Sequence, residues 1–412
     1  MGRICIVRTS AGRAATLLLA IGLSLLSGCR SDAIPEAPEA ASLPSETASA
    51  LAPPAEEIAF DPLFARIAGL PGPPQAPAAW QEESCWDDYR ALAGKAWEDF
   101  DGAVICRMKA WAEDGLREAR ASTSVLFYPF GGPDFVTADS LFPGAAVTVL
   151  IGLEPVGNLP DLDRASAEWR QAFFADLGEL VSGFLKRGYF ITKDMNDIYT
   201  RGKVDGALPV IAFFLARGGC SVVDISRLAP DGNGGWSERP YERMIARPHR
   251  PYGVKIVYRK SGDPSDRAVY YFSCDVENRA FPTGSPLHRF FAGLERMTTF
   301  VKSGSYLLHW NNFSTLRRLI LEKSLYVLQD DTAVPYRFFE GGGWEVRLFG
   351  RYVTPVKDFT NVEQPDLRRA YEDPSSAVSP LPFHFGYRWK SQIDNLLLAR
   401  RLRRTYKAPV LR

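Results

Sequence analysis

The chain has 412 residues, which allows two or three domains, or one large domain with tails. Apolar residues make up 46% and charged residues 24%, a globular balance that excludes wholesale disorder. With 49 basic and 48 acidic residues the net charge is +1, which argues against a polycationic nucleic-acid binder. Only four histidines occur, which argues against a His-rich metal protein.

The N-terminus has the features of an export signal. Three arginines precede an apolar stretch of about thirteen residues that ends at Leu26, whereas a membrane-spanning helix needs about twenty. The stretch closes with Leu26-Ser27-Gly28-Cys29. This motif resembles the lipobox of bacterial lipoprotein precursors, in which a large apolar residue and two small ones precede a cysteine. The resemblance implies that residues 1–28 are a signal peptide and that Cys29 becomes the lipidated mature N-terminus.

A lipidated Cys29 would make the membrane the first partner of this chain. Several acyl chains, at about 0.8 kcal/mol per buried methylene, form a stable anchor. Arg30 follows the cysteine; an aspartate there would resemble an inner-membrane retention signal, so an outer-membrane location in the cell envelope is favoured. The alternatives are a plain secretory signal or an uncleaved anchor, with Cys29 incidental.

Residues 29–79 differ in composition from the rest of the chain. Residues 31–79 include 10 prolines and 14 alanines. Such a segment cannot bury a core, so we expect a disordered, extended tether between lipid and body. Apolar residues recur at helical spacing only between Ile58 and Leu70, and we expect that piece to dock on the body.

Residues 80–412 contain no second linker and no internal repeat, so we expect one large body. The patterns predict helical structure over 84–120, with a second helix near 103–119, and helices over 163–186, 286–296, 313–323 and 365–372, and another from Pro209 to Gly218-Gly219. They predict strands at 125–130, 146–153, 221–225, 304–309, 324–329 and 382–389, with hairpins over 253–275 and across 341–343.

Strands and helices alternate through the middle of the body. This alternation predicts an α/β fold with a mostly parallel, Rossmann-like sheet that carries helices on both faces. The hairpins predict an antiparallel extension of that sheet.

Four cysteines belong to the body. An even count in an exported chain allows two disulfides in three possible pairings. We expect Cys85–Cys106 and Cys220–Cys274, because each pair lies in one neighbourhood of the chain. Four buried free thiols are the alternative. No CxxC spacing occurs, so the cysteines predict no zinc or thioredoxin-type site.

Carboxylates follow three of the predicted strands. Asp134 comes after the first, Glu154 after the second, and Asp330 with Asp331 after the strand at 324–329. In open α/β sheets, ligands bind beyond the carboxyl ends of the strands. If the strands are parallel neighbours, the acids converge and could supply an acid/base pair or orient sugar hydroxyls. Helix capping and turn formation are the alternative roles.

His309 lies between a predicted strand and a predicted helix. It is a candidate general base at the same edge of the sheet, or a residue that caps a helix. The chain has no phosphate-loop, HExxH, GxSxG or GxGxxG motif, so each corresponding enzyme class is disfavoured. No cofactor and no metal site is predicted.

Two further resemblances concern the start of the body. A strand, a glycine turn, a short helix and a strand ending in an acid resemble the opening of the Rossmann-type methyltransferase fold; Gly131 and Glu154 would then hold the cofactor. The compartment argues against that activity, because the methyl donor is not expected outside the cytoplasm. Residues 127–134 and 152–155 also resemble segments of uncharacterised exported bacterial proteins, which implies no activity.

The sequence thus predicts a membrane-anchored envelope lipoprotein that binds a ligand or partner, such as a small molecule or glycan, and no nucleic acid. The alternatives are a secreted hydrolase that uses carboxylates at strand ends and a degenerate methyltransferase-like fold.

Overall fold

The computed structural model describes residues 60–71, 84–233, 235–242, 252–384, 386–390 and 393–402. They belong to one of two units of the chain, the unit that begins at Ala59. The expected signal peptide, Cys29 and most of the expected tether lie outside the described residues.

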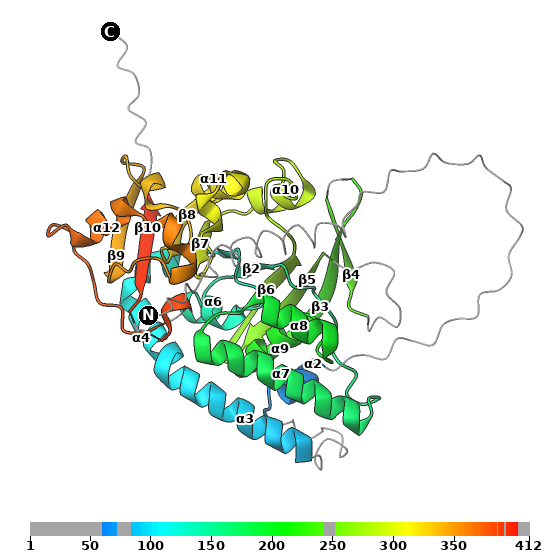
Figure 1. Cartoon of the computed structure of the whole chain (residues 1–412). Coiled ribbons are helices and arrows are strands. Elements are labelled where there is room, and N and C mark those ends of the chain that lie inside the picture. Colours follow the sequence, from blue (N-terminus) through cyan, green and yellow to red (C-terminus); the bar gives the residue numbers. More distant parts are fainter. Residues whose placement is uncertain are drawn as a thin grey trace, which may run out of the picture. The chain divides into compact units, whose positions relative to one another are not determined.

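Ten strands of the described chain form one sheet in the order β4-β3-β5-β6-β2-β1-β7-β8-β10-β9 (Figure 1). Their bounds are β1 Val125–Tyr128, β2 Val147–Gly152, β3 Cys220–Pro230, β4 Trp236–Pro240, β5 Gly253–Lys260, β6 Asp263–Ser273, β7 Met297–Val301, β8 Ser324–Gln329, β9 Trp344–Gly350 and β10 Asn395–Arg401.

The expected mostly parallel, Rossmann-like sheet is wrong. Five of the nine strand pairings are antiparallel, and the four parallel ones join β6, β2, β1, β7 and β8 at the centre. The antiparallel part is larger than the expected extension for two reasons. β3 and β4 join the hairpin of β5 and β6 at one side, and β10 inserts between β8 and β9 at the other.

The central strands are buried on both faces. All four residues of β1 are buried. Phe127 packs on Phe291 of α10, whereas Tyr128, on the opposite side of the pleat, contacts Phe300. Two-sided burial explains the continuous apolar run at 125–128, which is typical of parallel strands covered by helices.

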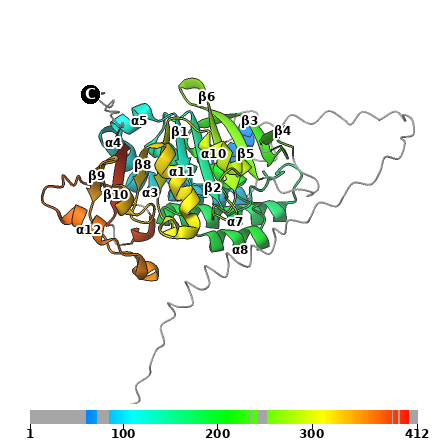
Figure 2. The same cartoon turned by 90° about the horizontal axis from the view of Figure 1, so that it is seen from above.

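Helices cover both faces of the sheet. In Figure 1, α3 and α7 lie side by side below the sheet and α10 and α11 lie above it; Figure 2 shows the sheet from above. The bounds are α2 Phe60–Ile67, α3 Ser84–Phe100, α4 Cys106–Gly115, α5 Arg117–Ser122, α6 Phe135–Leu141, α7 Ala167–Arg187, α8 Thr192–Arg201, α9 Leu208–Arg217, α10 Pro286–Ala292, α11 Ser314–Lys323 and α12 Pro365–Glu372. A π-helical turn, η2 (Asp101–Ile105), joins α3 to α4, and short 3₁₀ turns include η3 (Leu307–His309) and η5 (Tyr336–Phe338).

The described part of the apolar piece expected at 58–70, residues 60–70, docks on the body, as expected. It forms α2, whose Leu63, Phe64 and Ile67 are buried. Asp61 accepts a hydrogen bond from the backbone of Val222 in β3, and the Tyr89 hydroxyl donates to the carbonyl of Ile67. The packed body therefore begins before residue 80, inside the segment expected to be tether.

Several expected elements are displaced near the C-terminal end. Residues 304–309, 382–384 and 386–389 form loops and 3₁₀ turns, and the strands are β7 and β10 instead. The glycines at 341–343 precede β9 without forming a hairpin, because β10 separates β8 from β9. Residues 396–398, a run of three leucines inside β10, are buried between those neighbours.

Candidate functional site

The order of the parallel strands reverses beside β1. The chain runs from β1 to β2 on one side and returns to β7 and β8 on the other, so β1 and β7 flank the switch point. Ligands of open α/β sheets bind at such points, beyond the carboxyl ends of the strands. We call the residues that follow β1, β2, β7 and β8 the carboxyl-end rim. The rim contains a β1 loop (129–134) and a β7 loop (302–306).

The four predicted carboxylates all lie on this rim, because the strands before them are parallel. They do not follow adjacent strands, since β7 separates β1 from β8. Each carboxylate is buried and hydrogen-bonded within the protein.

Asp134 forms a buried ion pair with Lys302. The Lys302 Nζ lies 2.8 Å from Oδ2 of Asp134, and both side chains are 1% exposed. The Tyr128 hydroxyl donates to the same oxygen at 2.9 Å, and Oδ1 accepts from the backbone of Thr137, which caps α6. Lys302 also donates to the carbonyl of Gly188. Asp134 therefore caps a helix, as its alternative role predicted, and Lys302 is a partner that the sequence analysis missed.

Glu154 lies beside the glycine turn of the β1 loop. A Cβ on Gly132, the residue after Gly131, would stand 3.5 Å from its Oε2. The carboxyl group is 2% exposed, and the Tyr271 hydroxyl donates to the Glu154 carbonyl at 2.8 Å. Burial raises the pKa of Glu154. The cofactor role of Gly131 and Glu154 stays a prediction.

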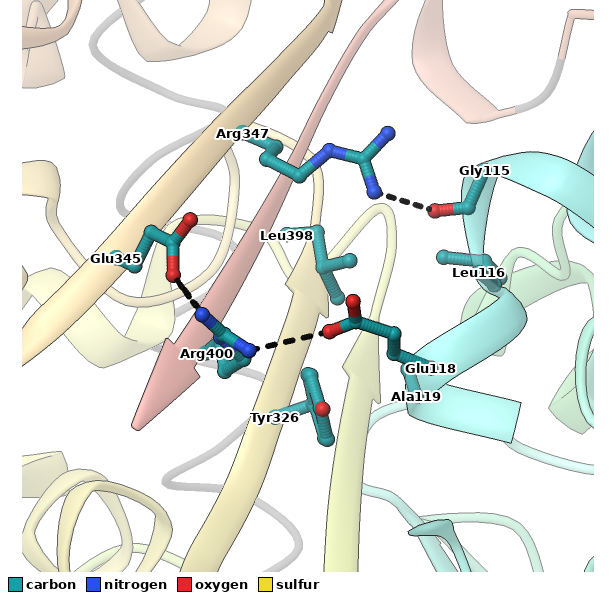
Figure 3. Close-up of a pocket in the computed structure, with 9 residues that line it drawn as sticks. All are labelled: Gly115, Leu116, Glu118, Ala119, Tyr326, Glu345, Arg347, Leu398 and Arg400. Carbon is teal, nitrogen blue, oxygen red and sulfur yellow. Dashed lines mark hydrogen bonds and ion pairs between the residues drawn. The ribbon is translucent and has the colours of Figure 1, made fainter. Parts of the chain in front are cut away.

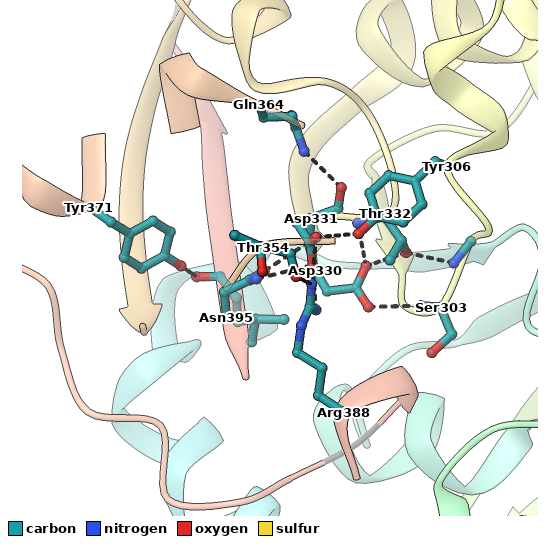
Figure 4. Close-up of polar contacts among 12 residues, drawn as sticks. Ser303, Tyr306, Asp330, Asp331, Thr332, Thr354, Gln364, Tyr371, Arg388 and Asn395 are labelled. Carbon is teal, nitrogen blue, oxygen red and sulfur yellow. Dashed lines mark hydrogen bonds and ion pairs between the residues drawn. The ribbon is translucent and has the colours of Figure 1, made fainter. Parts of the chain in front are cut away.

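The Asp331 carboxylate accepts hydrogen bonds from three side chains (Figure 4). Arg388 binds both of its carboxylate oxygens, with Nη1–Oδ1 and Nη2–Oδ2 distances of 2.7 and 2.9 Å. The Tyr306 hydroxyl and the Asn395 amide donate to the same group. A bidentate guanidinium with two further donors satisfies this carboxylate, so Asp331 ties β8 to the C-terminal segment.

Asp330 accepts hydrogen bonds from the backbone of two loops. Its Oδ2 accepts from Ser303 N at 2.8 Å, and its Oδ1 accepts from Thr332 N at 2.9 Å and from the Thr332 hydroxyl. Burial and the neighbouring Asp331 raise the pKa of Asp330 to about 6. Asp330 thus links β8 to the β7 loop and titrates near neutral pH.

His309 lies in η3, beside the Tyr306 ring. Burial, with Arg337 nearby, lowers the pKa of His309 to about 4, so the ring is neutral at pH 7. The backbone of Asp331 hydrogen-bonds the ring, whereas its Nε2 is buried without a hydrogen-bond partner. A neutral imidazole can act as an acceptor.

Four residues of the two rim loops have backbone conformations that favour glycine. Phe130 in the β1 loop has φ 65°, and Ser303, Ser305 and Tyr306 in the β7 loop have φ 54°, 52° and 55°. Each conformation costs roughly 1–2 kcal/mol in a residue with a side chain. Hydrogen bonds hold the β7 loop in place, including one from the Tyr387 hydroxyl to the Ser303 carbonyl. The Ser303 hydroxyl is itself buried without a hydrogen-bond partner.

The rim can hold and orient a ligand more readily than it can move protons. Its carboxylates are committed to internal donors, and the polar atoms without partners are Ser303 Oγ and Nε2 of His309. Within the described residues, no group of three or more His, Cys, Asp or Glu side chains is arranged to hold a metal ion.

A small cavity of about 90 Å³ lies away from the rim (Figure 3). It opens beside Tyr326, near the amino end of β8, and beside α5. Arg400 bridges Glu345 and Glu118 at its wall, and Arg347 donates to the Gly115 carbonyl. None of the predicted site residues lines it.

The predicted disulfides do not form. The structure contains neither the Cys85–Cys106 nor the Cys220–Cys274 disulfide. Cys85 and Cys106 begin α3 and α4 of one helical run, so about 30 Å of helix separates them. Cys220 pairs with Lys260 at the turn between β5 and β6, whereas Cys274 follows the opposite end of β6. A disulfide requires Cα atoms within about 7 Å.

No helix of the described chain is both long enough and apolar enough to cross a bilayer. Searches of protein-family models, of curated proteins and of solved structures found no match to this chain.

Proposed function

We propose that this chain is a lipid-anchored protein of the bacterial cell envelope that binds a carbohydrate ligand at the carboxyl-end rim without catalysing a reaction on it. The anchor rests on Leu26-Ser27-Gly28-Cys29 at the end of an apolar stretch of signal-peptide length. An outer-membrane location is the favoured address, on the basis of Arg30.

The cluster of left-handed residues carries the proposal for the rim. Strained conformations persist only where the surrounding structure enforces them, and they concentrate at ligand clamps and active sites. Here Phe130 belongs to the loop after β1, and Ser303, Ser305 and Tyr306 belong to the loop after β7, the two strands that flank the switch point. Ser303 adds a buried hydroxyl without a partner, which a ligand can satisfy.

Aromatic rings beside the β7 loop favour a carbohydrate. The rings of Tyr189 and Tyr387 lie 5.0 Å apart, and Phe359 stacks on Tyr387 at 5.9 Å. The hydroxyls of Ser305 and Tyr387 are hydrogen-bonded to each other at 2.6 Å. Aromatic faces next to hydroxyl groups match a sugar, which has apolar C–H faces and many hydroxyls.

The internal ion pairs of the carboxylates favour ligand binding over catalysis. Asp134 and Asp331 each form an ion pair with a cation, Lys302 or Arg388, so their carboxylate oxygens are already occupied by internal partners. A hydrolase is the second candidate function, because Asp330 has a pKa raised to about 6, the range of a general acid or base.

The test uses the full-length lipidated protein in detergent micelles on an array of neutral and acidic oligosaccharides. We expect binding without the release of new reducing ends. Ser303→Gly, which removes the hydroxyl and relaxes the loop, should lower binding at least tenfold. Ser261→Gly in the exposed hairpin turn is the matched control and should bind as the unmodified chain does.

Two results would overturn this function. Release of reducing ends that Asp330→Asn abolishes would establish the hydrolase instead. Equal binding by Ser303→Gly and Ser261→Gly would remove the rim as the site. The anchor is tested separately: mass spectrometry should find an acylated Cys29 at the mature N-terminus, and Cys29→Ala should abolish both acylation and processing.

A further inference from the structure

Two arginines meet on one aromatic ring next to the carboxyl-end rim. The guanidinium carbon of Arg317 lies 4.8 Å from the centre of the Phe338 ring, and that of Arg337 lies 5.1 Å from it. The two guanidinium carbons are therefore within about 10 Å of each other. Phe338 belongs to η5, the turn that follows β8, so the pair lies on the β8 side of the rim.

Arg317 also holds the backbone around His309. Its Nη1 donates to the carbonyls of Leu308 and Trp310, at 2.6 and 3.0 Å. These two carbonyls flank the His309 residue, so the guanidinium lies against its peptide. We call Arg317, Arg337 and His309 the basic cluster.

The basic cluster has no acid to neutralise it. Within the described part of the chain, neither Arg317 nor Arg337 forms an ion pair with a carboxylate. The acid next to His309 is Asp331, which gives both oxygens to Arg388. Burial lowers the pKa of both Arg317 and His309, and the charge of Arg337 lowers them further. Like charges are held together at a cost, which a bound anion would relieve.

His309 adds an unused acceptor to these two cations. Its Nε2 is buried without a hydrogen-bond partner, and a neutral imidazole can accept a hydrogen bond through one ring nitrogen. A ligand hydroxyl can satisfy it. Trp310, the next residue, is 47% exposed and offers an aromatic face.

We infer that the basic cluster binds an acidic sugar, a hexose that carries a carboxylate or a phosphate. The guanidinium groups of Arg317 and Arg337 hold the anionic group, a sugar hydroxyl donates to Nε2 of His309, and the indole of Trp310 covers an apolar face of the ring. This inference rests on the proposed function, because it assigns the class of carbohydrate that the carboxyl-end rim takes.

The experiment is a calorimetric titration of the full-length lipidated protein in micelles. The probes are glucuronate and glucose 6-phosphate, with glucose and acetate as the neutral-sugar and simple-anion controls. We expect at least one acidic sugar to bind, with glucose and acetate at least tenfold weaker. Equal affinity for glucose would overturn the role of the arginines, and equal affinity for acetate would overturn recognition of a sugar.

Three variants separate the parts of the cluster, with folding verified by circular dichroism. Arg337→Gln removes an exposed cation and should weaken acidic-sugar binding at least tenfold. Arg239→Gln removes an equally exposed cation from β4, at the opposite side of the sheet, and should change nothing. His309→Phe keeps an aromatic ring and removes the acceptor, so it should weaken glucuronate more than acetate. Equal affinities of Arg337→Gln and Arg239→Gln would overturn the inference.

The outcome is distinguishable from failure of the proposed function. Neutral oligosaccharides that bind in a Ser303-dependent way, without any binding of an acidic sugar, would leave the proposed function in place and reject the basic cluster. Binding of glucuronate that depends on Arg337 but not on Ser303 would support the cluster and reject the switch-point site.

Discussion

Two regions of the same sheet differ in which residues have left-handed backbone conformations and in how deeply their ion pairs are buried. In the described residues of the antiparallel half, β3 to β6, left-handed φ values occur only at glycines, Gly232 and Gly262. At the carboxyl-end rim they occur at Phe130, Ser303, Ser305 and Tyr306. The hairpins use the residue type that suits each turn, whereas the rim keeps side chains in positions that penalise them. Such a difference is expected between a structural region and a binding region.

Charges show the same contrast. In the antiparallel half, Lys255 pairs with Glu238 at 2.9 Å with side chains 24% and 45% exposed, so solvent screens the pair. At the rim, Lys302 and Asp134 pair at a similar distance with 1% exposure. Replacing only one member of the rim pair therefore leaves a buried, unpaired charge and should lower the free energy of unfolding strongly.

The largest expected effect is the loss of that buried pair. Lys302→Met leaves the Asp134 carboxylate buried without its cation and should lower the free energy of unfolding by about 3–5 kcal/mol. Lys255→Met, the matched change at the exposed pair, should cost at most about 1 kcal/mol. Urea denaturation followed by circular dichroism measures both. Similar losses in the two variants would contradict the contrast between the regions.

The next effect is a pH dependence of opposite sign in the two regions. The folded pKa of Asp330, about 6, lies above an unfolded value of about 3.9, so the native state binds the extra proton. Its contribution is fully present below about pH 4 and is lost as the pH rises through about 6, a change of roughly 2–3 kcal/mol. Asp330→Asn should flatten this fall.

Asp263 in the hairpin turn behaves in the reverse way. Hydrogen bonds from Ser265, with Arg267 nearby, lower the pKa of Asp263 to about 2. Its contribution is present above the unfolded pKa and is lost as the pH falls towards 2. Asp263→Asn should therefore lower stability above about pH 4, and the difference from the unmodified chain should shrink as the pH falls towards 2. Urea denaturation between pH 3 and 7 measures both variants, and a fall between pH 4 and 6 that is as steep in Asp330→Asn as in the unmodified chain would contradict the assignment.

Local signals allowed part of the fold to be predicted. The helix from Pro209 to Gly218 was predicted from its first-turn proline and closing glycine, and α9 spans Leu208–Arg217. The amphipathic helix predicted over 163–186 is α7, capped by Ser166 and Gly188. The strand directions could not be predicted, because pairing depends on which strands meet. β10, for example, pairs with β8 and β9 through the apolar run 396–398.

The sequence analysis predicted the acidic residues of the candidate site, but it missed the basic residues that accompany them. The positions of Asp134, Glu154, Asp330 and Asp331 at one rim follow from strand ends that the sequence reveals. Lys302, Arg388 and the basic cluster reach the rim from elements that the sequence does not place. The signal that could have pointed to the β7 loop is Ser303-Gly304-Ser305, a turn composition after an apolar strand, which was assigned to a strand instead.

The smallest expected effects come from exchanging serine and glycine at left-handed positions of the two regions. Ser303→Gly relieves a left-handed serine and removes a buried hydroxyl without a partner, so it should raise the free energy of unfolding by about 1 kcal/mol. Gly262→Ser places a side chain at φ 78°, where a Cβ meets no atom within 4 Å, so backbone strain alone should lower stability by about 1 kcal/mol. Thermal denaturation of both variants measures the pair. A rim variant that gains stability while losing ligand has the signature of strain kept for binding, whereas a loss of stability in Ser303→Gly would make the β7 loop a structural turn like the hairpin.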